Sequence, residues 1–201
     1  MDKEFFNRNA EIVAKELLGK ILVRKIGNKE LHGRIVETEA YFDEKDPASR
    51  ARQNGDLRDT MKMESGTILV YGVHNSWLIN FVTDEEGKAS AVLVRAVEPL
   101  NFFGKCNGPG LLTKALKIGK EFHKQNIVNN KEMWIEDFDN ENIDNDQTLG
   151  SEKEEISNKS DNFVIINNNF EIIESFRIGV KKDLPKKLRF YIKDNKFVSR
   201  K

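Results

Sequence analysis

The chain has 201 residues, which gives room for one domain with a sizeable core, or for two very small ones at most. Its 33 acidic and 33 basic side chains give a formal net charge of zero, and its single cysteine, Cys106, excludes an internal disulfide and fits a reducing compartment. A signal-peptide pattern and apolar runs near the roughly 20 residues of a membrane span are both missing, so we expect a soluble intracellular protein.

Apolar spacing near the N-terminus predicts a helix. Between residues 10 and 18 the apolar side chains fall on one helical stripe, which a helix buries against a core. Asn7 or Asn9 is suited to cap its first turn, and Gly19 is suited to end it. This is the clearest helical signal in the chain.

Most of the other elements read as strands. Gly27-Asn28 is a hairpin signature between two strand-like segments, and a Gly-Pro-Gly loop precedes a short helix. The predicted strands cover 21–26, 30–41, 67–72, 77–83, 90–100, 163–174 and 187–193, and the short helix covers 110–119. This order predicts a mixed α+β fold with a mainly antiparallel sheet.

The charges are unevenly distributed along the chain. Residues 137–161 hold 9 acidic and 2 basic side chains, which leaves 24 acidic and 31 basic ones, a net +7, for the rest. Apolar residues in 137–161 follow neither a helical nor a strand periodicity. This segment is predicted to be an acidic low-complexity insert that forms a mobile loop. The tail 177–201 has 10 Lys or Arg against 2 Asp. The net positive charge outside residues 137–161 suits a polyanionic partner. A solvated lysine-rich surface explains these charges equally well.

The segment 33–42, GRIVETEAYF, raises a question about its polar residues. Alternation along a strand sends Ile35, Glu37, Glu39 and Tyr41 to one side of the sheet. A solvated face explains two glutamates there at little cost. A carboxylate that works beside an aromatic ring is the functional alternative.

Several chemistries have little support in the sequence. His32, His74 and His123 are far apart and lack metal-ligand spacing with Cys106, so we expect no metal. There is no GxSxG elbow and no P-loop, and Gly-Pro-Gly at a helix start is only a weak hint of phosphate binding. We expect no cofactor.

Five stretches, in the same order and spacing, resemble the alkyladenine (3-methyladenine) DNA glycosylase family. The resemblance spans nearly the whole chain apart from the acidic insert. The stretches are ELLGKILVRKI at 16–26, GRIVETEAY at 33–41, VLVRAVEPL at 92–100, CNGPGLLTKALKI at 106–118 and LRFYIKDNKFVSR at 188–200.

The resemblance implies a single glycosylase domain over 1–201, with a curled antiparallel sheet flanked by helices, as in the C-terminal domain of methionyl-tRNA formyltransferase. It implies a monofunctional, monomeric enzyme that flips damaged purines out of double-stranded DNA and hydrolyses the N-glycosidic bond. An abasic site then forms without strand cleavage. We expect such a repair enzyme in the cytoplasm or nucleoid, or in the nucleus of a eukaryote. We expect no membrane partner.

Position by position, the family's catalytic glutamate falls on Glu39 and its base-stacking tyrosine on Tyr41. Two residues apart on a strand, they point the same way. Arg95 matches an arginine near the active-site glutamate and water, and a buried Arg–carboxylate pair is the structural alternative. For Glu37 we favour a structural hydrogen bond over a solvated position.

Three departures from the family pattern concern the base pocket. Arg50 stands where the family commonly has a histidine, and it either enters the pocket or contacts phosphate. Tyr71 is either the wedge that fills the gap left by the flipped nucleotide or a second stacking ring. Under either reading Asn80 and His74 line the site. Leu111 replaces a lysine, so one phosphate contact is expected to be lost.

Two other classes compete with this interpretation. A nucleic-acid-binding module without catalysis would share the fold, yet it has no use for a carboxylate aimed at a polyanion. A glycosidase of free sugars usually needs a second positioned carboxylic acid, for which Glu37 is a poor candidate. The sequence does not say which lesion is preferred; it predicts a bias toward neutral bases if Arg50 enters the pocket.

Overall fold

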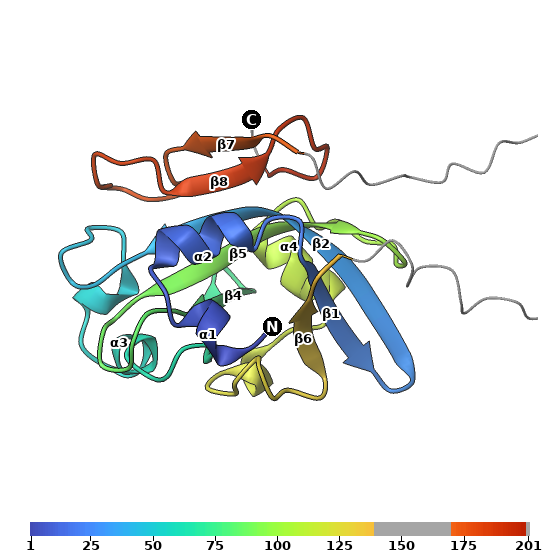
Figure 1. The fold of residues 1–201 in the computed structure, drawn as a ribbon, viewed down its shortest axis with the longest axis horizontal. Coiled ribbons are helices and arrows are strands. Elements are labelled where there is room, and N and C mark those ends of the chain that lie inside the picture. The colour runs from blue at the N-terminus through green and yellow to red at the C-terminus, as the bar shows by residue number, and fades with distance from the viewer. Residues whose placement is uncertain (139–169, 200–201) are drawn as a thin grey trace, which may run out of the picture.

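An eight-stranded antiparallel sheet that curls into a half-barrel forms the frame of the computed structural model, which describes residues 1–138 and 170–199 (Figure 1). The strand order is β3-β4-β5-β2-β1-β6, and β8 joins β2 to β7. The strands are β1 (Ile21–Ile26), β2 (Lys29–Tyr41), β3 (Ile68–Val73), β4 (Ser76–Val82), β5 (Ala91–Pro99), β6 (Met133–Glu136), β7 (Ile172–Ser175) and β8 (Arg189–Ile192).

Short helices surround this sheet, which confirms the α+β class. They are α1 (Lys3–Phe6), α2 (Ala10–Glu16), α3 (Asp56–Met61), α4 (Pro109–Ala115) and the 3-10 turns η1 (Arg50–Arg52) and η2 (Lys120–Phe122). The likeness to the formyltransferase C-terminal domain stays a prediction. Apart from Asp137 and Phe138, the acidic insert predicted at 137–161 lies outside the described residues.

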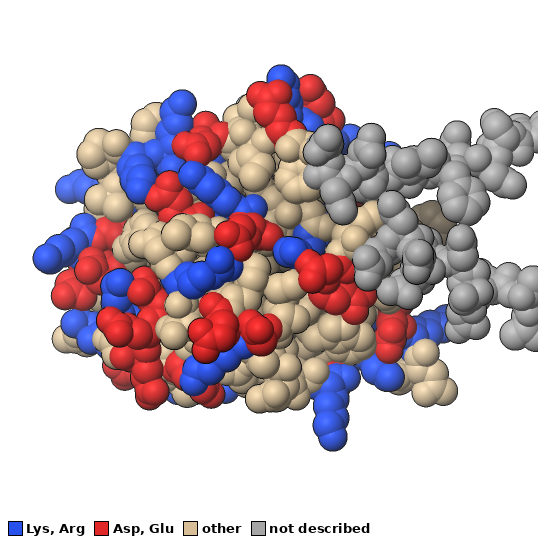
Figure 2. All heavy atoms as spheres, in the orientation of Figure 1, with Lys and Arg blue, Asp and Glu red and all other residues tan. Residues whose placement is uncertain are grey.

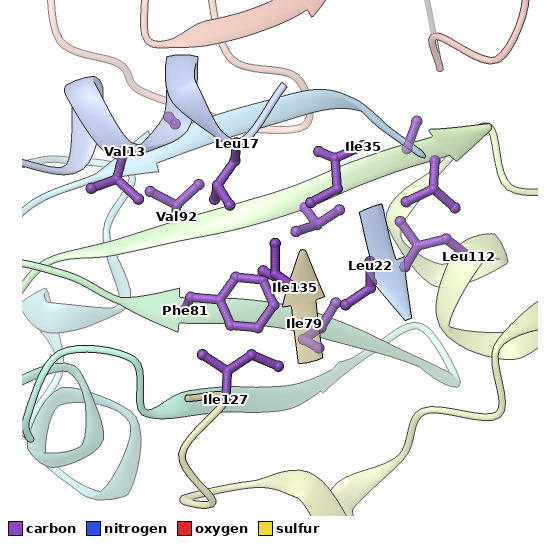
Figure 3. Packing of buried hydrophobic residues seen from close by; sticks show 14 of the residues in the cluster. Val13, Leu17, Leu22, Ile35, Ile79, Phe81, Val92, Leu112, Ile127 and Ile135 are labelled. Carbon is purple, nitrogen blue, oxygen red and sulfur yellow. The ribbon is translucent and has the colours of Figure 1, made fainter. Parts of the chain in front are cut away.

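The predicted N-terminal helix is α2, and its capping residue is Asn9. The Asn9 side chain accepts a hydrogen bond from the Glu11 N–H, and Gly19 has a φ of 86°, a conformation that glycine adopts without strain. Val13 and Leu17 point from α2 into the core beside Val92 of β5 (Figure 3). The helix therefore fixes one face of β2 and β5 as the core face.

The longest strand, β2, has different partners on its two edges. Along one edge it pairs with β5; along the other it pairs first with β1, through the predicted hairpin at Gly27-Asn28, and then with β8. Residues 37–39 thus lie between a central strand and the C-terminal hairpin. A functional side chain here can be contacted from both ends of the chain.

The predicted position of Ile35 is wrong. Ile35 points into the core (Figure 3). It belongs to the same cluster as Val36 and Ala40, whereas Glu37 pairs with Arg95 and Arg189. The pairing of β2 with β5 is irregular between Ile35 and Glu37, and such a bulge breaks strict alternation. Beyond the bulge, the polar residues of β2 keep their common face.

Of the described elements, the sequence signals missed α1, α3, β6 and the two 3-10 turns. Residues 56–61 lack an apolar stripe, and β6 has only four residues, so neither gives a periodic pattern long enough to detect.

In the part of the chain that the structure describes, no helix is both long enough and apolar enough to cross a membrane.

Candidate active site

Strand register aligns the polar residues of the face opposite α2. Leu93 of β5 lies opposite Glu39 of β2 and also opposite Asn80 of β4, while Arg189 of β8 lies opposite Glu39 on its other edge. A single line across four strands therefore runs from Asn80 to Arg189. Glu39 is at its middle.

Glu39 is a fully buried carboxylate with donors from three parts of the chain. Its Oε2 accepts from the Tyr41 hydroxyl at 2.7 Å and lies 3.2 Å from Arg95 Nη1. Its Oε1 accepts from the backbone N–H of Ile178 at 2.8 Å. The predicted pair of Glu39 and Tyr41 thus forms a direct hydrogen bond.

The surroundings of Glu39 favour a proton-accepting role. Burial raises the pKa of Glu39, and Arg95, Tyr41 and the Ile178 N–H offset only part of that rise. Burial and the Glu39 charge raise the pKa of Tyr41 well above 10.0, so the Tyr41 hydroxyl stays protonated and donates a hydrogen bond to Glu39. A carboxylate with a raised pKa is a better base than one in water.

Glu37 is also fully buried, so the solvated reading is wrong and the structural hydrogen bond is confirmed. Its Oε1 accepts from Arg95 Nε at 3.2 Å, from Arg189 Nε at 2.6 Å and from Ser199 Oγ at 2.9 Å. Its Oε2 accepts from the Ser199 N–H at 2.7 Å. Arg95 therefore bridges two carboxylates.

Tyr41 is backed by a second buried ion-pair cluster. The Arg177 guanidinium lies 4.6 Å from the centre of the Tyr41 ring and donates to both Asp46 oxygens at 2.7 Å. It also donates to the Ala40 carbonyl and to Asp183. One face of the Tyr41 ring is thus occupied by protein.

Arg50 lies against the second predicted ring. Its guanidinium carbon is 5.0 Å from the centre of the Tyr71 ring, and both Tyr71 and Tyr41 pack on the small cluster that contains Met61. Burial raises the pKa of Tyr71, and the Arg50 charge opposes that rise. Arg50 therefore contacts a ring that packs on the same cluster as Tyr41.

The chain matches known proteins along its whole length. The family model described as Methylpurine-DNA glycosylase (MPG) matches residues 4–164. Its relatives include proteins named "Putative 3-methyladenine DNA glycosylase" in three organisms. The proteins of Borrelia garinii and Aeropyrum pernix are each 36% identical to this chain, and that of Clostridium perfringens is 33% identical. The matches cover 100% of this chain and 100%, 93% and 99% of those relatives.

The chain belongs to the methylpurine-DNA glycosylase family. As a DNA glycosylase, it is a hydrolase of N-glycosyl bonds that acts in the repair of alkylated DNA. The alternatives of a non-catalytic binding module and a free-sugar glycosidase have no support from these matches.

Other predicted site residues of the glycosylase lie farther from Glu39. Asn80 is buried and donates to the Leu69 carbonyl at 3.1 Å, which is a bond within the sheet. His74 is exposed at the turn of the β3–β4 hairpin, with a φ of 47°. Leu111 is an exposed side chain of α4.

Sequence reasoning missed the contribution of the C-terminal segment, residues 170–199. Ile178, Arg189 and Ser199 supply donors to Glu39 and Glu37 although they lie 139 to 162 residues away in the sequence. No local pattern reports such distant contacts. The signal available was the family stretch at 188–200, which contains Arg189 and Ser199.

The basic tail 177–201 does not offer all of its charge to a polyanionic partner. Arg177 and Arg189 are buried and pair with carboxylates, so they cannot reach DNA. Lys181 and Lys182 are exposed in the loop that follows Ile178. On the face drawn in Figure 2, acidic and basic side chains are interspersed.

No group of three or more His, Cys, Asp or Glu side chains is arranged to hold a metal ion within residues 1–138 and 170–199. Burial raises the pKa of Cys106 to about 11, so its thiol stays protonated at neutral pH.

Proposed function

We propose that this glycosylase flips alkylated or deaminated purines out of duplex DNA and hydrolyses their N-glycosidic bond with a water activated by Glu39. The released base and an abasic site are the products, and no strand cleavage follows because no covalent lysine intermediate is required. The observation that carries this proposal is the Glu39 carboxylate, which is buried between Arg95, Tyr41 and Ile178.

Glu39 has room for one more hydrogen bond. Each carboxylate oxygen has two lone pairs, and among the described residues Oε1 accepts from Ile178 alone, so it retains a position for a water. Glu39 takes a proton from that water while the water oxygen bonds to C1′ of the sugar and the bond from C1′ to the base nitrogen breaks. The carboxylate also stabilises the oxocarbenium character of the sugar.

Tyr41 and Tyr71 supply the faces on which the flipped base stacks. Arg177 occupies one side of the Tyr41 ring, which leaves the other side for the base. We assign Tyr71 to a second stacking ring because it is only partly exposed and packs on the same cluster as Tyr41. Stacking on such rings holds a base regardless of its substituents.

The wedge role then passes from Tyr71 to the turn of the β3–β4 hairpin. His74 is exposed there, and Trp77, which lies opposite Gly72, is 39% exposed. A large ring on a projecting hairpin is suited to enter the gap that a flipped nucleotide leaves.

Substituting glutamine for Glu39 tests the catalytic assignment. Glutamine has nearly the same shape and cannot take a proton, so Glu39→Gln should bind DNA and lose most base excision. Single-turnover release of hypoxanthine or 7-methylguanine from a duplex measures the rate. A general base contributes about 10²–10⁴-fold, so we expect a loss of that order.

Affinity for an abasic-analogue duplex and the thermal unfolding midpoint are the controls, and both should stay near the wild-type values. If Glu39→Gln excised bases within about tenfold of the wild-type rate, Glu39 would not be the base. If excision disappeared together with DNA binding, the pure binding role of this carboxylate would be favoured instead.

A further inference from the structure

The Glu37 carboxylate accepts hydrogen bonds from three residues. Four hydrogen bonds reach its two oxygens, one from Arg95, one from Arg189 and two from Ser199. These donors belong to β5, to β8 and to the end of the described chain. Glu37 thus joins the central strand pair to the C-terminal segment.

Arg95 connects Glu37 to the proposed base. Its Nε is 3.2 Å from Glu37 Oε1, and its Nη1 is 3.2 Å from Glu39 Oε2. A guanidinium is planar and rigid, so fixing its Nε also fixes the direction of Nη1. The position of Arg95 at Glu39 therefore depends on Glu37.

Charge adds a second link. Glu37, Glu39, Arg95 and Arg189 carry two negative and two positive charges, all buried in one cluster. If Glu37 lost its charge, Arg95 would be attracted by Glu39 alone and the cluster would carry a net charge of +1. Buried charges this close interact strongly because little water screens them.

We propose that Glu37 is a positioning residue for the hydrolysis: through Arg95 it sets the placement and protonation of Glu39, and through Ser199 it holds the C-terminal segment on the site. This inference rests on the proposed role of Glu39 as the base. The hydrogen bonds of Glu37 within the described residues run to Arg95, Arg189 and Ser199. Its effect therefore shows in the pH dependence of the rate.

The groups that face Glu39 come from every element around it. Tyr41 and Glu37 of β2, Arg95 of β5 and the Ile178 N–H contact it directly or through one side chain. Arg189 acts through Glu37, Arg177 lies on the Tyr41 ring, and Tyr71 interacts electrostatically with Glu39. Among these groups, Glu37 is the other carboxylate.

The test is the pH profile of single-turnover excision by Glu37→Gln. The negative charge of Glu37 raises the pKa of Glu39, so its removal should keep Glu39 ionised to lower pH. The acid limb of the profile should therefore move to lower pH. The plateau rate should fall on the order of tenfold, because Arg95 is no longer held in place.

Glu98→Gln is the matched control. Glu98 lies on β5, accepts from Arg34 of β2 and accepts from Asn195 of the C-terminal segment, yet it has no contact with Arg95. Its substitution weakens an ion pair on the same two strands and should leave the acid limb in place. If Glu37→Gln and Glu98→Gln lowered the rate equally, with unmoved acid limbs, Glu37 would be structural only and the inference would fail.

A second variant covers the case in which Glu37→Gln does not fold. Glu37→Asp keeps the charge and shortens the side chain, so the acid limb should stay while the plateau rate falls. A wild-type rate in Glu37→Asp would overturn the inference. These outcomes are separate from those of Glu39→Gln, which test the proposed function.

Discussion

Arg50 places a positive charge on the Tyr71 ring, and within residues 1–138 and 170–199 no carboxylate lies at ion-pair distance from it. The guanidinium of Arg177 lies on the Tyr41 ring in a similar way, but Asp46 and Asp183 neutralise it. The two rings therefore present different electrostatic environments to a base. Arg50 has the unbalanced charge, so it is the residue that can distinguish cationic from neutral bases.

Replacing Arg50 with leucine should favour cationic lesions. The Arg50 charge repels a cationic base by up to about 1 kcal/mol where water screens the two charges, so Arg50→Leu should raise the excision of 7-methylguanine relative to hypoxanthine up to about fivefold. Paired single-turnover rates on the two duplexes measure this ratio. Arg52→Leu, in the same η1 turn, is the control. A ratio unchanged in Arg50→Leu would mean that Arg50 acts on the backbone and not on the base.

The loop between β7 and β8 is held on the site by buried ion pairs. Arg177 donates to both oxygens of Asp46, and the next residue, Ile178, donates its N–H to Glu39. Burial works to raise the pKa of Asp46, but the Arg177 hydrogen bonds outweigh it and lower the pKa below the ordinary 3.8. Anchoring the loop is thus coupled to the charge of Asp46.

Asp46→Asn should destabilise the fold by about 3–5 kcal/mol at neutral pH, because it breaks a buried ion pair. A carboxyl whose pKa is lower in the folded state stabilises the fold above its unfolded pKa of 3.8 and loses that contribution as the pH falls through the folded value. The difference between wild type and variant should therefore shrink in acid. Urea unfolding at about pH 7 and about pH 3 measures it. Glu64→Gln, which breaks an exposed pair with Lys3, should change stability little at either pH.

The elements that sequence alone predicts are those with local signals. Asn9 and the apolar stripe determine α2, Gly27-Asn28 determines the first hairpin, and a two-residue spacing places Glu39 beside Tyr41. The bulge near Ile35 left no such signal, because it depends on how β5 pairs with β2. The donors from residues 170–199 were missed for the same reason, since they depend on contacts across the whole chain.

The net charge of zero for the whole chain does not describe the surface near the site. Arg177, Arg189 and Arg95 are used inside the protein, so the basic tail offers fewer phosphate contacts than its composition indicates. Lys181 and Lys182 are exposed and only a few residues beyond Ile178, which contacts Glu39. They are therefore suited to hold a DNA backbone beside the flipped nucleotide.

Removing both lysines should weaken DNA binding without affecting the chemical step. Each phosphate contact contributes a slope of about −0.9 to the dependence of log affinity on log salt, so Lys181→Ala with Lys182→Ala should make the slope less steep by up to about 1.8. Titrations of a fluorescent duplex at several salt concentrations measure the slope. The excision rate of bound substrate should stay the same because neither lysine touches Glu39.

Lys186 and Lys193 provide the matched control for this pair. Both are exposed and lie in the same C-terminal segment, but they pair with Glu11 and Glu171, so their charge is already balanced. The double substitution Lys186→Ala with Lys193→Ala should change the slope less. Equal slopes in the two double variants would mean that the tail contributes only general charge, and that the phosphates beside the site are held by another surface of the glycosylase.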